Sequence, residues 1–272
     1  MSDIDIESLL GIEEEGKVLA VCSSKGGVGT TSIAVNLAIA LSKRSANVAL
    51  VDGNFQFGNV ALSLNINPSI SIHNLQQEIT QLDEYSIMNY LIGDESGIHF
   101  LAAPDRPEYA ELITDEVIDK TLIYLKKKFD YIIVDVGNCV DQVALKVYDH
   151  AFKILPVTTM EIGSLKNMKS FLDILERLEF AEKVGLIINR YNMDSIVKVE
   201  EVKKLFQVNE TYYIPNNIKL MQQALNIGKP IVSGHTKSDV AKGIFKMAQS
   251  LSEKSTYKIP RKKKGLAKLF SK

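Results

Sequence analysis

The sequence has few cysteines, few histidines and almost no net charge, and each shortage argues against a class of protein. Cys22 and Cys139 are the two cysteines among 272 residues, and they lack CxxC spacing, so no disulfide framework or zinc site is readable and a reducing cytosol is expected. The four histidines are scattered without HxxxH spacing, which predicts ordinary packing or surface positions. A formal net charge of −1 argues against a histone-like protein that coats nucleic acid.

Long apolar runs are also lacking. No uninterrupted stretch approaches the ~18–20 apolar residues that span a bilayer, and the acidic N-terminus has no apolar segment typical of a signal peptide. We therefore expect a cytoplasmic protein. Charge is segregated at the ends, because the first fifteen residues contain six acids and no base, whereas the last fifteen contain seven bases and no acid. Such ends predict a tail with an electrostatic partner.

Short apolar runs alternate with helical patterns along most of the chain. This alternation predicts a single α/β domain with a mostly parallel, twisted sheet and helices on both faces. Residues 1–16 are expected to be an acidic lead-in, 17–252 the folded domain, 253–260 a linker and 261–272 a basic tail. The expected strands are 18–22, 48–51, 100–103, 131–134, 154–157, 184–188 and 212–214, and the expected helices are 33–41, 114–128, 140–149, 161–178, 198–206, 218–226 and 237–252.

A glycine-rich segment connects the first expected strand to the first expected helix. Glycine has no Cβ and tolerates positive φ, so such a backbone can wrap closely around phosphates. The amides at the N-terminus of the following helix then face the anion. This context favours a phosphate loop, whose general pattern is GxxxxGK[ST], over an ordinary turn. The segment is Ser24-Lys25-Gly26-Gly27-Val28-Gly29-Thr30-Thr31, followed by Ser32.

This segment resembles the deviant Walker A motif of the MinD/ParA superfamily, which is usually written KGGxGK[ST]. The resemblance implies a P-loop NTPase fold, ATP or ADP with Mg²⁺ as cofactors, and a homodimer that closes across the nucleotide. It also implies that Lys25 reaches the phosphates of the partner subunit and that Thr31 ligates magnesium. The family's second lysine, which contacts the bound phosphates, is replaced by Thr30, and this departure puts catalytic competence in question without affecting the fold.

Two acids at strand ends match further motifs of the family. Asp52 resembles the first acid of switch I and would contribute to the magnesium site, whereas the second acid, which orients the attacking water, is replaced by Asn54. An amide hydrogen-bonds water but cannot take a proton. Asp135 ends a strand that resembles Walker B, where it would hold the magnesium shell. Helix capping is the alternative role for both acids.

Asparagines at the ends of two later strands match the family's base-binding segments. The resemblance assigns adenine recognition to Asn189, with Arg190 beside it. A second base-contacting segment would be Pro215, Asn216 and Asn217. An ordinary turn-forming role is the alternative for these asparagines.

The two replacements bear on activity. Phosphoryl transfer depends mainly on positioning and charge neutralisation, and loss of one well-placed donor slows a reaction about 10²–10³-fold. Thr30 and Asn54 both deviate from the family pattern. The sequence therefore predicts a nucleotide-binding protein that is at most a slow ATPase.

Four segments further resemble the CpaE/TadZ branch of the superfamily, which is associated with Flp/Tad pili; they are 51–62, 101–112, 214–217 and 228–230. This resemblance implies a nucleotide-bound scaffold that positions pilus proteins or another surface machine. The alternative is an active partitioning ATPase for DNA or plasmids, or for placing a division or flagellar site. An iron–sulfur or nitrogenase-reductase relative is disfavoured, because Cys22 lies inside an expected strand and Cys139 is the sole other cysteine.

The basic tail, residues 261–272, places Leu266, Leu269 and Phe270 at helical spacing among lysines. An apolar stripe with a basic collar is typical of helices that lie at a membrane surface. The tail resembles the membrane-targeting helix of MinD-like proteins, which implies reversible binding to the anionic inner face of the cell membrane by the two tails of a dimer. A solvated tail is the alternative, and DNA contact is a third, less favoured option.

Overall fold

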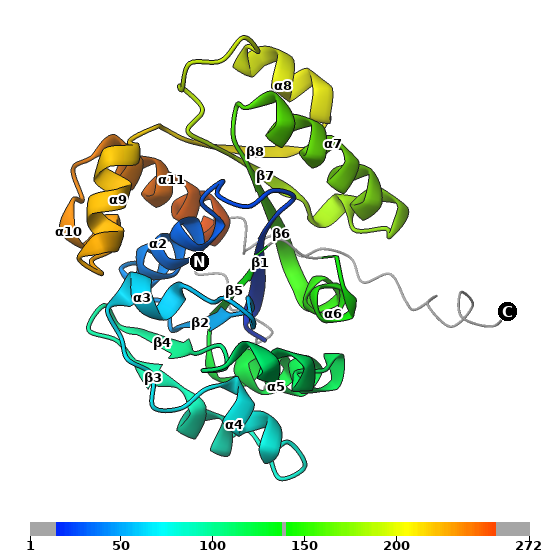
Figure 1. Ribbon diagram of the computed structural model, residues 1–272, viewed down its shortest axis with the longest axis vertical. Helices are drawn as coiled ribbons and strands as arrows, with labels where there is room; N and C mark the ends of the chain where they lie inside the picture. Colours follow the sequence, from blue (N-terminus) through cyan, green and yellow to red (C-terminus); the bar gives the residue numbers. More distant parts are fainter. Residues whose placement is uncertain (1–14, 138–139, 254–272) are drawn as a thin grey trace, which may run out of the picture.

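The computed structural model describes residues 15–137 and 140–253, and Figure 1 shows them as a central sheet with helices on both sides. The predictions for Cys139, for the basic tail and for most of the lead-in and linker lie outside these residues. Within the described residues, no helix is both long enough and apolar enough to cross a membrane.

The sheet of the described chain has eight strands in the order β3-β4-β2-β5-β1-β6-β7-β8. Neighbouring strands are parallel, except that β3 runs antiparallel to β4. The prediction of a mostly parallel sheet is confirmed. The strands are β1 (Lys17–Ser23), β2 (Val48–Asp52), β3 (Ile92–Gly93), β4 (Ile98–Leu101), β5 (Tyr131–Gly137), β6 (Ala151–Thr158), β7 (Gly185–Asn189) and β8 (Glu210–Ile214).

The helices divide into two groups that cover opposite faces of the sheet (Figure 1). One core cluster contains residues of α4, α5, α6, α7 and α8, and the other contains residues of α2, α3, α9, α10 and α11. The helices are α2 (Thr30–Ser42), α3 (Val60–Leu64), α4 (Ile72–Gln77), α5 (Asp115–Lys128), α6 (Gln142–His150), α7 (Ile162–Arg177), α8 (Val199–Phe206), α9 (Ile218–Asn226), α10 (Ile231–Gly234) and α11 (Asp239–Glu253).

The central strands are buried on both faces, which explains their uninterrupted apolar sequences. Residues Val18 to Cys22 of β1 are 0% exposed. Because β1, β2, β5, β6, β7 and β8 run in the same direction, their carboxyl ends meet at one edge of the sheet. Ligands of open α/β sheets bind outside this edge. The residues that end three of these strands there are Ser23, Asp52 and Asn189.

Candidate functional site

The loop between β1 and α2 has the backbone shape of a phosphate site. Gly27 and Gly29 have φ of 80° and 99°, in the left-handed region that favours glycine. A Cβ at Gly26 or Gly27 would meet no atom within 4 Å, so the space beside this backbone is open. No side chain caps α2. Its first amides are therefore available to an anion at the helix N-terminus.

The residues predicted to follow the loop form the first turn of α2. Thr30, which stands where the family has a lysine, is the first residue of the helix and is buried. Thr31 and Ser32 follow and are half-buried. The loop and the helix start thus have the predicted arrangement, while the contacts of these residues with phosphate stay a prediction.

Asp52 and Asp135 lie side by side beside this loop, because they are register partners at the ends of β2 and β5. They are 2% and 0% exposed. Burial raises the pKa of Asp52 to about 7, and repulsion from the Asp135 carboxylate adds to this rise. Burial likewise raises the pKa of Asp135 to about 6. Among the described residues, no positively charged side chain counters the rise of either pKa.

The two carboxylates differ in their hydrogen bonds. Asp52 accepts the backbone N–H groups of Asn54 and Val60 at 3.2 Å each. Neither carboxylate oxygen of Asp135 has a hydrogen-bonding partner among the described residues. Asp52 therefore contacts Val60, the first residue of α3, whereas the capping alternative for Asp135 stays untested.

These groups fit a magnesium ion. Unpaired buried carboxylate oxygens are costly unless a cation compensates them. The Thr31 hydroxyl is close enough to Asp135 to oppose the rise of its pKa, although it does not reach hydrogen-bonding geometry. Mg²⁺ prefers oxygen ligands and is usually held by one or two carboxylates, with waters and substrate phosphates completing its shell. The described residues offer no cluster of three His, Cys, Asp or Glu side chains, which agrees with such a shared shell.

Asn54 participates in the turn that follows Asp52. Its Nδ2 donates to the carbonyl of Phe57 at 3.1 Å, and its Oδ1 accepts the Phe57 N–H at 3.4 Å. Gly58 lies directly against the Asp52 carboxylate, since a Cβ there would be 2.3 Å from Oδ2. The Asn54 amide thus orders the switch segment, and a role in orienting water stays a prediction.

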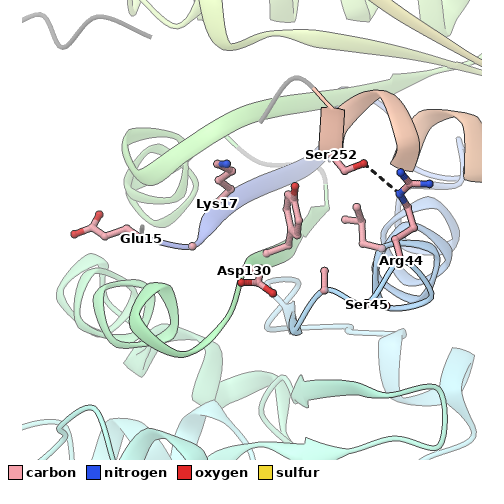
Figure 2. Close-up of a pocket in the computed structure, with 10 residues that line it drawn as sticks. Glu15, Lys17, Arg44, Ser45, Asp130 and Ser252 are labelled. Carbon is pink, nitrogen blue, oxygen red and sulfur yellow. Dashed lines mark hydrogen bonds between the residues drawn. The ribbon is translucent and has the colours of Figure 1, made fainter. Parts of the chain in front are cut away.

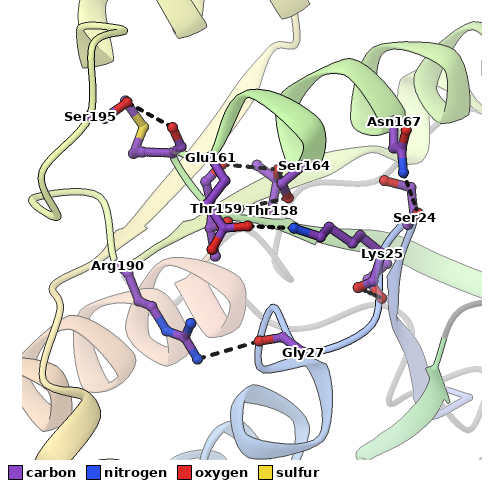
Figure 3. Close-up of polar contacts among 12 residues, drawn as sticks. Ser24, Lys25, Gly27, Thr158, Thr159, Glu161, Ser164, Asn167, Arg190 and Ser195 are labelled. Atoms are coloured by element: carbon purple, nitrogen blue, oxygen red, sulfur yellow. Dashed lines mark hydrogen bonds and ion pairs between the residues drawn. The ribbon is translucent and has the colours of Figure 1, made fainter.

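Figure 3 shows that two side chains, one just before α7 and one on α7, contact the first half of the phosphate loop. The Nζ of Lys25 forms an ion pair with Glu161, the residue that precedes α7. Asn167 of α7 donates from Nδ2 to the carbonyl of Ser24 at 3.4 Å. In a single chain Lys25 is therefore held in place, and its predicted contact with a partner subunit requires that this ion pair open.

Two residues at the end of β7 hold the second half of the loop. Asn189, which is buried, donates from Nδ2 to the carbonyl of Val28 at 2.8 Å. Arg190 donates from a terminal guanidinium nitrogen to the carbonyl of Gly27 at 3.4 Å (Figure 3). A Cβ at Gly29 would lie 2.6 Å from Nδ2 of Asn189. The structure therefore brings the predicted base-binding residues to the loop, and their contact with adenine stays a prediction.

The second predicted base segment lies between β8 and α9. Asn217 accepts the N–H of Leu220 at 3.1 Å and caps α9. The backbone N–H of Asn216 donates to Oδ1 of Asn192 at 2.6 Å. Pro215 is half-buried, and both asparagines are exposed. Asn217 thus has a local structural role, and base contact by this segment stays a prediction.

Sequence reasoning missed Glu161 and Asn167. The pairs they form join residues 136 and 143 positions apart, which no local pattern reveals. One signal was available, because Glu161 lies in the segment that follows the expected strand 154–157, four residues after its carboxyl end. An acid in that place points toward the edge of the sheet where ligands bind.

A separate hollow lies at the opposite, amino-terminal edge of the sheet (Figure 2). It has a volume of about 340 Å³, and Lys17, Asp130 and Arg44 are among its lining residues. Arg44 donates to Ser252 at 3.2 Å. The hollow is far from the glycine loop along β1 and contributes nothing to the site described above.

A strand, a glycine loop and a helix, with two strand-end carboxylates beside the loop, define a P-loop nucleotide-binding protein. Residues 19–228 match the family model described as "CobQ/CobB/MinD/ParA nucleotide binding domain". The chain belongs to this family. The resemblance to the MinD/ParA superfamily and the predicted fold class are thereby confirmed.

Named relatives agree with this assignment. The septum site-determining protein MinD of Synechocystis is 27% identical over 222 residues, which are 79% of this chain and 82% of that protein. The MinD of Thermotoga maritima is 26% identical over 250 residues, 87% of this chain and 88% of that protein. Both matches extend over most of each chain.

Solved structures show the same fold. A ParA family ATPase from Chlorobium tepidum has a TM-score of 0.80 at 26% identity, covering 88% of this chain and 100% of that one. The MinD of Pyrococcus horikoshii, solved in complex with Mg-ADP, has a TM-score of 0.77 at 20% identity, covering 89% and 98%. The second likeness supports the fold alone.

Proposed function

We propose that this chain is an ATP-binding positioning or assembly factor of the MinD/ParA type. It acts as a nucleotide-bound dimeric scaffold with slow or absent hydrolysis. The observation that carries this proposal is an open backbone cradle with Thr30 at the position of the family's lysine. The groups needed for nucleotide binding are present, whereas the family's lysine, which would stabilise negative charge on the transferred phosphoryl group, is replaced by Thr30.

The described residues retain the groups that nucleotide binding requires. The amides of α2 and the glycine loop would hold the phosphates, and Thr31, Asp52 and Asp135 would hold magnesium. Magnesium, when bound, neutralises charge between the phosphates. The P. horikoshii relative was solved with Mg-ADP, which supports the same cofactor here. Lys25 completes the site from the partner subunit once it leaves Glu161.

The experiment is a comparison of Mg-ATP binding, turnover and dimerisation in the wild type and a Thr30→Lys variant. We expect the wild type to bind Mg-ATP by calorimetry and to release phosphate at least tenfold more slowly than Thr30→Lys. A Thr30→Met variant has a side chain of similar length without charge, so it should stay slow. Equal turnover in the wild type and Thr30→Lys would contradict the proposal, as would the absence of any heat of nucleotide binding.

We propose that the scaffold positions proteins of a Flp/Tad-type pilus. Support comes from the segments 51–62, 101–112, 214–217 and 228–230, which resemble the CpaE/TadZ branch. A fluorescent fusion should form foci that disappear when the pilus genes are deleted. A diffuse signal, or foci that do not depend on those genes, would count against this assignment.

Peripheral attachment to the anionic inner face of the cell membrane is proposed for the basic tail, residues 261–272. Its composition of lysines around Leu266, Leu269 and Phe270 supports this role. The full chain with ATP should sediment with anionic liposomes, and a chain truncated after residue 260 should not. Unchanged sedimentation after truncation would exclude the membrane role.

A second candidate function is an active partitioning or site-placing ATPase. It is favoured by relatives named as septum site-determining proteins, among them those of Synechocystis and T. maritima. An Aquifex aeolicus MinD with this fold was solved in complex with MinC, so this candidate also includes a protein partner. Wild-type turnover equal to that of Thr30→Lys, with ATP-dependent and salt-sensitive DNA binding, would favour this candidate.

A further inference from the structure

The two edges of the described sheet differ in how much free backbone they offer. At one edge β3 has two residues, whereas at the other edge β8 has five and pairs on one side alone, with β7 (Figure 1). Proteins commonly protect an edge strand with lysine, proline or a bulge. β8 has none of these: its register with β7 is regular, and its residues are Glu210, Thr211, Tyr212, Tyr213 and Ile214. Threonine, tyrosine and isoleucine favour strand pairing, so this edge suits the addition of another strand.

A groove lies beside this edge, between α8 and α11. Its volume is about 400 Å³, and no residue of β7 is among the described residues that line it. The wall contains every residue from 208 to 213, together with Lys203 of α8 and with Gly243, Lys246, Met247 and Ser250 of α11. We call it the β8 groove. A cavity of this size has room for the side chains of a strand that pairs with β8.

The β8 groove carries uncompensated positive charge. Lys203 and Lys246 line it, are exposed and form no ion pair among the described residues. Glu210 is the sole acid among the described lining residues, and its charge is compensated, because it accepts from Nζ of Lys153 at 2.8 Å and from the Tyr212 hydroxyl at 3.0 Å. The groove therefore favours an acidic strand. It disfavours pairing with β8 of another copy, which would bring the lysines of two grooves together.

The lead-in contains an acidic segment with the periodicity of a strand. Residues 3–7 are Asp3-Ile4-Asp5-Ile6-Glu7, in which acids and isoleucines alternate strictly. In a strand this order puts the acids on one face and the β-branched isoleucines on the other. We propose that residues 3–7 of a second copy of this chain add as a strand to the free edge of β8. Main-chain hydrogen bonds would give affinity, and the two faces of the added strand would meet the two walls of the groove.

A second copy supplies this strand more readily than the same chain does. Glu15 pairs with Lys126 of α5 at 3.3 Å, and α5 packs on α6 and β5, on the side of β1 away from β8. Through the registers of β6 and β7, Glu210 is level with Val21 of β1. A strand added there lies about 19 Å across the sheet and about 20 Å along it from Glu15. The chain from Glu7 to Glu15 covers that distance, about 28 Å, only when fully extended.

Donation of a strand from one copy to the next is a heterologous contact. Such contacts link copies head to tail into rings or open chains, unlike a dimer that closes across a nucleotide. The β8 groove contains no residue of the glycine loop and neither of the paired carboxylates. The proposal therefore goes beyond the nucleotide-bound dimer, and its tests are made without nucleotide.

The first test titrates the full chain with a fluorescein-labelled peptide of residues 1–14, followed by fluorescence anisotropy. The matched peptide carries Ile4→Asp and Asp5→Ile, which keep the composition and charge but break the alternation. We expect saturable binding of the natural peptide and at least tenfold weaker binding of the matched one. Equal affinities would show that charge alone is recognised and would overturn the added strand, as would the absence of saturable binding.

Main-chain pairing is tested with two further peptides, one N-methylated at Asp5 and the other at Ile6. Successive N–H groups of a strand point to opposite sides, so one of the two faces β8 and the other faces solvent. One methyl group should abolish binding, and the other should leave the affinity within about twofold. Equal effects of the two methyl groups would contradict strand addition.

Charge variants locate the binding. Lys203→Glu combined with Lys246→Glu should weaken binding of the natural peptide at least tenfold, because both side chains line the groove. Lys219→Glu combined with Lys237→Glu makes the same change of net charge at exposed lysines outside the groove and should leave binding unchanged. Equal weakening by the two pairs would refute the location.

Sedimentation velocity of the full chain identifies the source of the strand. We expect assemblies larger than a monomer that grow with protein concentration, and a monomer when the chain carries Ile4→Asp and Asp5→Ile. If the natural peptide binds but the full chain stays monomeric at concentrations above the Kd of the peptide, the strand comes from the same copy and the assignment to a second copy is wrong.

Discussion

Replacement of Asp135 by asparagine tests whether the carboxylate pair is built for a cation. Asp135 is 0% exposed, its oxygens have no hydrogen-bonding partner among the described residues, and Asp52 lies beside it. Without magnesium, its buried negative charge lowers the free energy of unfolding. We therefore expect the metal-free wild type to lose stability relative to Asp135→Asn as the pH rises to 8, and the variant to gain less stability from Mg-nucleotide.

The magnitude follows from the pKa of Asp135, which burial raises from 3.8 to about 6. Folding is favoured by this group below its unfolded pKa, and that stability is lost as the pH rises through the folded pKa. One pKa unit corresponds to about 1.4 kcal/mol, so the wild type should lose roughly 3 kcal/mol relative to Asp135→Asn between pH 4 and pH 8. Because this is a difference between two pH values, the cost of burying the asparagine amide cancels.

The assay is thermal unfolding of nucleotide-free protein in EDTA at several pH values between 4 and 8. About 3 kcal/mol corresponds to a change of roughly 6–12 °C in the difference between the two Tm values for a domain of this size. A parallel series with Mg²⁺ and ADP should raise the Tm of the wild type more than that of the variant, which keeps the loop amides but loses a magnesium ligand. If the two proteins show the same pH dependence in EDTA, the carboxylate is not an uncompensated buried charge and the reasoning is refuted.

Three further changes test other contacts. Glu161→Gln should release Lys25. Exposed ion pairs contribute about 0.2–1 kcal/mol and a dimer opens two of them, so ATP-dependent dimerisation in sedimentation velocity should tighten about two- to thirtyfold. An unchanged dimer dissociation constant would show that the ion pair does not restrain Lys25. Gly29→Ala should destabilise the fold by about 1–2 kcal/mol and weaken ATP binding in calorimetry, because of the positive φ and the contact with Asn189, whereas Gly163→Ala, which has open space, should not. Asn54→Asp should accelerate phosphate release in the Thr30→Lys background and have little effect alone. Equal acceleration in both backgrounds would show that the residues at positions 30 and 54 act independently in hydrolysis.

The sheet and the long helices were predictable because the pattern of apolar residues in the sequence indicates which strands and helix faces are buried. Apolar runs located β1, β2, β5, β6, β7 and β8 to within a few residues, and the helix over 218–226 was predicted with its observed ends. The short elements were missed. β3 has two residues, too few for a pattern, and α4 depends on the capping of Ser71 and Asn74 rather than on periodicity.

The parts of the site whose functional residues lie in one short segment were predictable. The glycine loop and the acids at the ends of β2 and β5 follow local signals, and the parallel topology then brings Asp52 beside Asp135. Contacts between segments were not predictable. Neither the pairing of Lys25 with Glu161 nor the approach of His73 to Tyr109 has a sequence pattern, because both depend on how distant loops pack.

One packing contact outside the site joins the segments that follow β2 and β8. Gly228 follows α9 so tightly against Asn65, at the end of α3, that a Cβ there would lie 2.4 Å from the Asn65 Cβ. The segment from Asp52 leads into α3, and the segment from Pro215 leads into α9. The segment predicted to lie near the phosphates and the segment predicted to contact the base therefore meet on the same face of the sheet. If a nucleotide binds as proposed, we expect a displacement of α3 near the phosphates to move α9 near the base as well, because the two helices meet at this contact.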